Sequence, residues 1–338
     1  MRPYPPCLPA IAVLASLLIP TAFSLTALDV PHDLQYAFVH GGELWLGAGR
    51  DGVFAAHLET GWVRHLTQGS GIPVGSTTCG ASAFGTVWLG SREGLFAQTD
   101  DGRWSEIEIP GLESPTVNCI AVQERFLWVG TSRGAARYDS ESGTWEVYTA
   151  ESGLSDSWIN SIWVTGEKVL FGTMRGGVCE LDTSTGNWLR WDKEDGLPSN
   201  CAFSVSAGDG YILAATPSGF GAYRRNWSSW ISYSAEMPSP AAYVVFWDKV
   251  LGAGLVGTGK GLVLWTPSSR SLETIDKVGE IELGRINWIG RAAGLLWITR
   301  NTDEWFGHTT TGVLGYNETS SSWLRPIYLD ILIDQAGY

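Results

Sequence analysis

The stretch Leu-Trp-Val-Gly-Thr at residues 127–131, followed by a Gly-apolar pair at 134–135, decides the fold because it recurs along the chain. Clear copies of the burst lie at 44–47, 87–90 and 169–172, and weaker ones lie around Ala215, Gly257 and Trp297. The glycines of the Gly-apolar pairs are 42, 40, 43, 42, 42 and 51 residues apart: Gly52, Gly94, Gly134, Gly177, Gly219, Gly261 and Gly312. A period near 40 residues with strand-like units is typical of a β-propeller, in which each copy forms one blade.

One repeat contains four short segments rich in β-branched and aromatic residues, at 116–122, 126–131, 134–139 and 144–149. Gly, Asp and Ser separate them, which predicts four antiparallel strands joined by tight turns. We therefore expect an all-β protein, a seven-bladed β-propeller of four-stranded antiparallel blades over residues 28–330, with a tail at 331–338. Because each blade is complete within its own repeat, closure of the ring is expected from side-chain packing between the first and last blades, without a shared strand.

The first 24 residues differ from the rest of the chain. One arginine, Arg2, precedes the short apolar run 8–20, and small residues follow it. This pattern predicts a secretory signal peptide over 1–24, with cleavage after Ser24 or after Ala27. The alternative is an uncleaved segment that tethers the protein. No later apolar run reaches the roughly 20 residues that cross a bilayer, so no other transmembrane span is expected.

The composition describes a folded, acidic protein. Hydrophobic residues make up 44% and charged residues 17% of the chain, and the formal net charge is -13. A surface this acidic repels phosphate backbones, so nucleic acid is excluded as a partner. We expect an exported protein, periplasmic or extracellular.

Residues 127–205 carry a longer composite pattern. The Leu-Trp-Val-Gly-Thr burst leads to a Gly-apolar pair, then to Asp-x-x-x-Gly-x-Trp at 139–145 and 182–188, and then to Gly-Leu-Ser or Gly-Leu-Pro at 153–155 and 196–198. This pattern resembles the two-component regulator propeller repeat. The resemblance implies an exported propeller related to the periplasmic sensing parts of hybrid sensor kinases. Only eight residues follow Asp330, so we expect a stand-alone relative without the kinase parts.

Tryptophans fall into two groups. Those that repeat with the blade are expected to pack one blade against the next, because aromatic side chains fill the wedge between neighbouring sheets. Those that break the period are candidates for a binding platform at the mouth of the central channel. Three of these are predicted site residues: Trp163, Trp247 and Trp288.

Polar residues enter the innermost strands at similar positions in five repeats. A partial ring at the channel mouth is predicted from Thr78, Asn118, Asn160, Asn200 and Asn287. Neutral donors and acceptors suit a small polar ligand, a saccharide or a peptide, but they supply neither a nucleophile nor a base. The alternative is that each Asn caps its own turn.

Histidine is scarce, and its placement suggests one further candidate site. Ring closure would bring His308 and Trp305, in the insertion of the last repeat, close to His40 in the first. Such a pair of histidines could form a metal site or an acid and base couple. No His-x-His or His-Glu-x-x-His spacing occurs, so no metal and no cofactor are predicted.

Cysteines occupy equivalent positions in two adjacent repeats. Cys79 and Cys119 each lie nine residues before their repeat's Trp. In an oxidising compartment they form a disulfide; alternatively they are buried free thiols.

These patterns favour a non-catalytic, exported propeller that acts as a sensor-like module and binds a ligand or a protein partner. The alternative is a carbohydrate-active enzyme or lyase with its site at the channel mouth. An enzyme requires acids, His, Arg or Tyr that converge on one face outside the repeat pattern.

Overall fold

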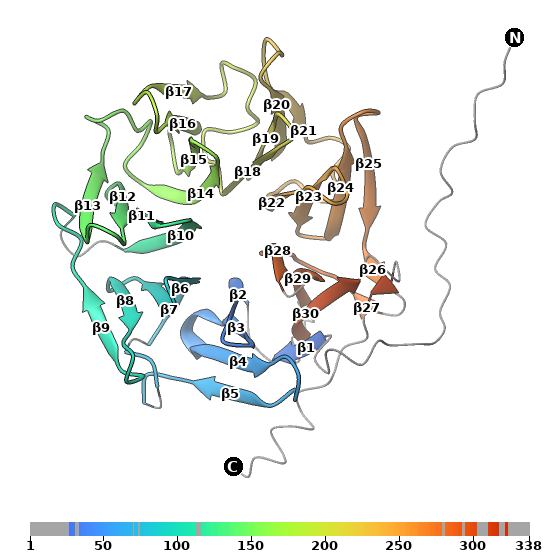
Figure 1. The fold of residues 1–338 in the computed structure, drawn as a ribbon. Coiled ribbons are helices and arrows are strands. Elements are labelled where there is room, and N and C mark those ends of the chain that lie inside the picture. The colour runs from blue at the N-terminus through green and yellow to red at the C-terminus, as the bar shows by residue number, and fades with distance from the viewer. Residues whose placement is uncertain are drawn as a thin grey trace, which may run out of the picture.

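A computed structural model describes residues 27–30, 34–69, 71–73, 75–112, 116–278, 281–292, 295–302, 310–317 and 322–323. Seven antiparallel sheets are arranged around a central axis, as the ring in Figure 1 shows. This confirms the predicted seven-bladed β-propeller. Within the described residues no α-helix occurs, and therefore none that is long and apolar enough to span a membrane.

Six blades are built from four consecutive strands each, with the first strand innermost (Figure 1). Blade 1 is β2 Tyr36–His40, β3 Glu43–Gly47, β4 Val53–His57 and β5 Val63–Leu66, with the 3-10 helix η1 Gly49–Asp51 between β3 and β4. Blade 2 is β6 Thr77–Ala83, β7 Thr86–Ser91, β8 Leu95–Gln98 and β9 Trp104–Ile107. Blade 3 is β10 Val117–Gln123, β11 Phe126–Thr131, β12 Ala135–Asp139 and β13 Thr144–Tyr148. Blade 4 is β14 Ile159–Thr165, β15 Lys168–Thr173, β16 Val178–Asp182 and β17 Trp188–Trp191. Blade 5 is β18 Ser204–Gly208, β19 Tyr211–Thr216, β20 Gly219–Arg224 and β21 Ile231–Tyr233. Blade 6 is β22 Ala242–Asp248, β23 Ala253–Thr258, β24 Gly261–Thr266 and β25 Ser271–Ile275.

Blade 7 is assembled from both ends of the chain. Its consecutive strands are β28 Ile289–Ala292, β29 Leu295–Thr302 and β30 Thr310–Asn317, and a small pair, β26 Lys277–Val278 and β27 Ile281–Glu282, precedes them. The outer edge of β30 pairs with β1 Ala27–Val30, in the register Leu28 opposite Val313, and also with the two-residue β31 Ser322–Trp323. The prediction that closure uses no shared strand is therefore wrong.

The physical reason lies in the edge of β30. An unpaired edge leaves a row of N–H and C=O groups without partners, and β1 satisfies part of that row with main-chain hydrogen bonds. β1 begins at Ala27, one residue before the predicted start of the propeller at 28. Signal cleavage after Ala27 would remove that residue, whereas cleavage after Ser24 would keep β1 whole.

The glycine of the repeated burst is required where blades meet. A Cβ atom at Gly130 would overlap Cys119 Sγ on the neighbouring strand and would lie 2.8 Å from Ile159 of blade 4. The corresponding atom at Gly90 would overlap Cys79 Sγ and lie 2.6 Å from Val117 of blade 3. The first strand and the next blade both approach the second strand at this position, so only glycine leaves room for them.

The hydroxyl residue after the glycine ties the second strand to the third. In blade 3, Thr131 Oγ1 donates to the Gly134 carbonyl at 2.8 Å and accepts the Arg133 N–H at 3.0 Å. The same bond to the glycine carbonyl recurs at four other blades, from Ser91, Thr173, Thr216 and Thr258. These buried hydroxyls are thus all satisfied, which explains why the burst runs on into Ser or Thr.

The tryptophans of the burst form the core between blades, as predicted. Trp128 and Trp297 are fully buried, and Trp45 and Trp88 nearly so. Trp128 meets Phe171 of blade 4 edge to face, with ring centroids 6.0 Å apart. One repeating tryptophan departs from the expectation: Trp62, at the start of the outermost strand of blade 1, is 60% exposed.

Candidate functional site

Antiparallel blades place equivalent turns on one face of the ring. Each blade's fourth strand ends where the next blade's first strand begins, so the blade-to-blade linkers and the turns between second and third strands share one face, which we call the linker face. The predicted amide residues lie at this face: Asn118 and Asn160 are the second residues of their blades' first strands, and Asn200 and Asn287 precede the first strands of blades 5 and 7. The hairpins between first and second strands lie at the opposite face.

The predicted polar ring joins neighbouring blades. Asn118 Nδ2 donates to the Ile159 carbonyl of blade 4 at 2.8 Å, and Asn160 Nδ2 donates to the Ala202 carbonyl at the start of blade 5 at 3.0 Å. Thr78 Oγ1 donates to the Val117 carbonyl of blade 3. These side chains do not cap their own turns, the alternative read from the sequence. They fasten one blade to the next, and ligand binding by them stays a prediction.

The other two members of the predicted ring make different contacts. Asn200 Oδ1 accepts the Lys193 N–H at 2.8 Å, so this side chain caps its own linker. The backbone N–H of Asn287 donates to Thr299 Oγ1 at 3.3 Å. The five residues therefore share a place on the linker face but not a common hydrogen-bonding role.

The three predicted platform tryptophans contribute to packing. Trp163 Nε1 donates to the Ala207 carbonyl of blade 5 at 3.0 Å, and its ring meets Phe246 edge to face. Trp247 is only 3% exposed and stacks on Tyr211 at 5.2 Å between centroids. Trp288 is half-buried and packs against two cores, the one between blades 7 and 1 and the one between blades 1 and 2. The structure does not bring these three rings together as one surface.

The predicted histidine seam is only partly described. His40 Nδ1 lies 2.9 Å from Ser82 Oγ of blade 2, which is the side away from blade 7. His308 and Trp305 lie outside the described residues. Among the residues that are described, no three His, Cys, Asp or Glu side chains are grouped closely enough to hold a metal ion.

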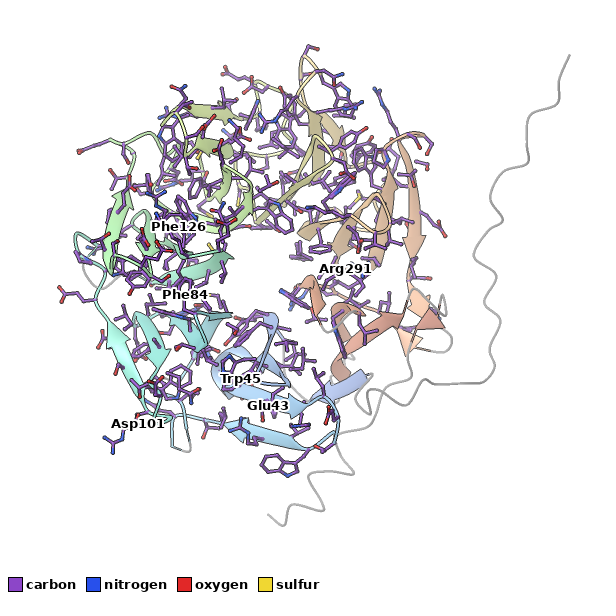
Figure 2. All side chains as sticks on the ribbon, in the orientation of Figure 1. Glu43, Trp45, Phe84, Asp101, Phe126 and Arg291 are labelled. Carbon is purple, nitrogen blue, oxygen red and sulfur yellow. The ribbon has the colours of Figure 1, made fainter. Side chains whose placement is uncertain are left out.

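A buried ion pair occupies the boundary between blades 6 and 7. Asp248 Oδ2 accepts from Arg291 Nε at 2.9 Å and from Nη2 at 2.7 Å, while Oδ1 accepts the N–H groups of Val250 and Leu251. The Asp248 side chain is fully buried, and Arg291 lies at the inner end of blade 7 in Figure 2. Sequence reasoning missed this pair because neither residue belongs to a motif.

The cysteines of blades 2 and 3 are free thiols, as are Cys179 and Cys201. Of the two alternatives, a disulfide and free thiols, the structure has free thiols, and no disulfide joins Cys79 to Cys119. Burial raises the pKa of the Cys79 thiol to about 12 and raises that of Cys119 well above its usual value. Both thiols are therefore protonated and poorly nucleophilic at neutral pH.

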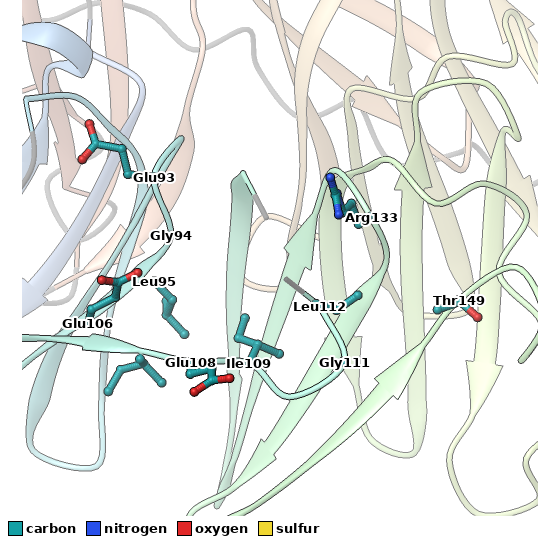
Figure 3. A pocket seen from close by; sticks show the side chains of 11 residues that line it. Glu93, Gly94, Leu95, Glu106, Glu108, Ile109, Gly111, Leu112, Arg133 and Thr149 are labelled. Carbon is teal, nitrogen blue, oxygen red and sulfur yellow. The ribbon is translucent and has the colours of Figure 1, made fainter. Parts of the chain in front are cut away.

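A groove of about 850 Å³ opens between blades 2 and 3 on the linker face (Figure 3). Buried Leu95, Ile109 and Leu112 form its apolar part. Four exposed charged side chains line it: Glu93, Glu106, Glu108 and Arg133. None of these four forms an ion pair with another described residue.

Sequence reasoning did not identify this groove. Its one sequence signal is the alternation Glu-Ile-Glu-Ile at 106–109, which places two carboxylates on the same side of an extended segment. That alternation is common at exposed outer strands. Only the meeting of blade 2 with the turn at Arg133 makes it the wall of a groove.

Comparison with known proteins supports the fold. No protein-family model and no curated protein matches the sequence. The extracellular domain of BT4673 from B. thetaiotaomicron, described as a one component system, matches with a TM-score of 0.65 and 19% identity over 86% of this chain and 39% of that chain. The extracellular domain of BT3049 from the same organism, described as a hybrid two component system, matches with a TM-score of 0.61 and 20% identity over 76% of this chain and 36% of that chain.

The WD40 repeats of RRP9 are equally similar in shape, with a TM-score of 0.65 and 11% identity over 85% of this chain and 96% of that chain. At such identities the similarity defines a class, the β-propellers, and agrees at the level of the fold with the predicted resemblance to sensor propellers. The chain spans less than two-fifths of the length of the two extracellular domains.

Proposed function

We propose that this chain is an exported, non-catalytic β-propeller that binds a small polar ligand, a saccharide, a peptide or a protein partner as a sensor-like module. The observation that carries the proposal is the groove between blades 2 and 3. It combines an apolar floor with charged side chains that have no ion-pair partner among the described residues. Concave surfaces of this size and mixed chemistry are typical of ligand sites.

The rest of the linker face supports binding by a rigid scaffold. The Thr78 side chain donates a hydrogen bond from blade 2 to blade 3, the two blades that form the groove, and Asn118 joins blade 3 to blade 4. These bonds hold the walls of the groove in place before a ligand binds. A preformed site binds without the cost of ordering its own side chains and loops. Two structural neighbours are extracellular domains of one component and hybrid two component systems, which favours a sensing role.

The signal-like segment at 1–24 supports export to the periplasm or the cell exterior. Cleavage before Ala27 would release a protein whose first strand is β1, and an uncleaved segment would tether the propeller through blade 7. Immunoblotting of cell fractions, with mass determination of the exported chain, tests this part of the proposal.

Binding is tested by screening the mature chain, residues 25–338, against glycan and peptide arrays and measuring each hit by calorimetry. Arg133→Gln and Glu106→Gln should weaken a hit that occupies the groove, whereas Glu273→Gln, on the exposed outer strand of blade 6, should not. Failure of every array member to bind would refute the proposal. Turnover of a glycan by the purified protein would replace it with the enzymatic alternative.

A further inference from the structure

Linkers between blades are fastened through a glycine carbonyl. At the boundary of blades 3 and 4, the Gly153 carbonyl accepts two hydrogen bonds from Arg190, at 3.1 Å from Nε and 2.8 Å from Nη2. At the boundary of blades 4 and 5, the Gly196 carbonyl accepts from Ser232 Oγ at 2.6 Å. In both cases the donor lies on the outermost strand of the later blade.

The boundary of blades 1 and 2 uses the same device with a different donor. The Gly71 carbonyl accepts from Trp104 Nε1 at 2.5 Å, and Trp104 begins the outermost strand of blade 2. Three linker glycines, at the boundaries of blades 1 and 2, 3 and 4, and 4 and 5, are thus held by an indole, a guanidinium and a hydroxyl, and each is followed by Leu or Ile. We call this contact the linker latch.

The latch is missing where the groove lies. Gly111, followed by Leu112, is the equivalent glycine between blades 2 and 3, and it lines the groove. The strand registers place Val147 at the position of Arg190 and Ser232. Each of the three precedes the residue that pairs with the apolar member of its blade's Gly-apolar pair, as Tyr148 pairs with Ala135. The Val147 side chain has no hydrogen-bond donor. Within the described part of the chain no group donates to the Gly111 carbonyl.

The charged side chains of the groove therefore include more hydrogen-bond acceptors than donors. Glu93, Glu106 and Glu108 contribute three carboxylates beside the unclaimed carbonyl of Gly111, against one guanidinium on Arg133. The four charged side chains sum to a net charge of about -2 at neutral pH. A complementary ligand is a cation with several N–H donors and an apolar stem, because the floor is apolar.

The molecule itself shows which group fits a linker glycine. Arg190 places its guanidinium on the Gly153 carbonyl with two N–H donors, one boundary away. We propose that the groove between blades 2 and 3 binds an arginine side chain of a partner peptide, whose guanidinium takes the place that Val147 leaves without a donor. This rests on the proposed function and names its ligand class.

In the bound state the guanidinium donates to the Gly111 carbonyl and to the carboxylates of the groove, and its methylene stem lies on the apolar floor. A planar, delocalised cation matches carboxylate oxygens in pairs, which an ammonium group does not. Arginine is therefore preferred over lysine. The groove also exceeds one side chain in volume, so the residues that flank the arginine lie within it.

The first arm of the test varies the ligand. Acetylated and amidated pentapeptides with Arg, Lys, citrulline or Glu at the centre are measured against residues 25–338 by calorimetry. We expect the Arg peptide to bind at least about tenfold more tightly than the citrulline peptide, which keeps the shape and most donors but lacks the charge, and binding should weaken with salt. Equal affinity for Arg and citrulline peptides would overturn the inference.

The second arm of the test introduces the missing donor into the protein by mutation. Val147→Arg copies the arrangement at Arg190 and should fill the groove, lowering Arg-peptide affinity at least about tenfold. The matched control is Thr274→Arg, which adds the same charge at the equivalent register position of blade 6. Thermal melts establish that both variants are folded. Unchanged peptide binding by a folded Val147→Arg protein would also overturn the inference.

The two proposals fail separately. If the wild-type protein binds a glycan or a peptide without dependence on arginine or on Val147→Arg, the arginine site is wrong while the binding function stands. If neither the array members nor the pentapeptides bind, both are wrong.

Discussion

Blades 3 and 7 solve the same structural problem with different parts of the chain. Blade 3 uses four consecutive strands, β10 to β13, and is complete within residues 117–148. Blade 7 has its own three inner strands, but β1 from the other end of the sequence covers most of its outer edge, beside the two-residue β31. The repeat therefore explains the interior of every blade, whereas closure of the ring depends on residues that the repeat does not contain.

Inside the two blades the packing is alike. Trp128 and Trp297 occupy the same place in the second strand, and both are fully buried. The turn that follows differs. In blade 3, Thr131 lies three residues after Trp128 and bonds to Gly134 across a short turn, whereas Arg300 stands at that position in blade 7. Thr299 takes the place of Gly130, two residues after Trp297, and its hydroxyl accepts the N–H groups of Asn287 and Trp288.

The largest expected effect tests the shared interior. Trp128→Ala should lower the free energy of unfolding by about 4 kcal/mol, since it removes a fully buried indole and leaves a cavity between blades 3 and 4. Trp297→Ala should cost a similar amount. Urea unfolding followed by circular dichroism measures both. A cost below about 1 kcal/mol for Trp297→Ala alone would show that blade 7 is not packed like blade 3.

The next effect concerns the ion pair that joins blades 6 and 7. Asp248→Ala should cost about 3 kcal/mol, because it leaves the Arg291 guanidinium without its buried carboxylate and two turn N–H groups without an acceptor. Glu273→Ala, at an exposed position of the same blade, serves as the control and should be nearly neutral. If Asp248→Ala is equally neutral in the urea titration, this pair does not hold the seam.

The third effect isolates the strand that blade 7 borrows. A mature chain that starts at residue 31 lacks β1 and should be less stable by about 2 kcal/mol than one that starts at residue 25, since a few main-chain hydrogen bonds are lost. Thermal melts of the two chains measure the difference.

A crosslink checks the register independently of stability. Leu28→Cys together with Val313→Cys places two thiols on directly opposed residues, within the distance that a disulfide spans. Oxidation should join them and raise the melting temperature. A pair shifted by one residue, Leu28→Cys with Gly312→Cys, should join less readily, and the opposite order would contradict the register of β1 on β30.

The architecture could be predicted from the sequence because the residues that pack one blade against the next recur with the period of the blades. Gly130 is fixed by the approach of Cys119 and Ile159, and Trp128 by the wedge that it fills, so both recur wherever a blade does. Closure of the ring by β1 could not be predicted from the repeat, because the four residues of this strand occur once in the chain and match no part of the repeat. The groove was equally hidden, since it forms only where blade 2 meets the turn at Arg133 of blade 3.

The polar candidates show a further limit of sequence reasoning. Asn118 and Asn160 were predicted to lie at the channel mouth, and the hydrogen-bond partners of their side chains are backbone carbonyls of the next blade. Every residue has a backbone carbonyl, so the sequence does not show which carbonyls accept a side-chain hydrogen bond. An Asn that binds the neighbouring blade therefore cannot be distinguished in the sequence from one that binds a ligand.

The smallest expected effect on stability concerns the hydroxyl groups near the ends of the second strands of blades 3 and 7. Thr131→Val keeps the shape of the side chain but removes the bond to the Gly134 carbonyl and the acceptor for the Arg133 N–H, and should cost about 1 kcal/mol. Thr299→Val should cost at least as much, because its hydroxyl is the acceptor for two N–H groups that open blade 7. Hydrogen exchange at those two amides separates the cases. Faster exchange at 287 and 288 in Thr299→Val but not in Thr131→Val would show that blade 7 uses a hydroxyl at the place of Gly130 to hold the start of its first strand, where blade 3 uses Thr131 to hold its turn.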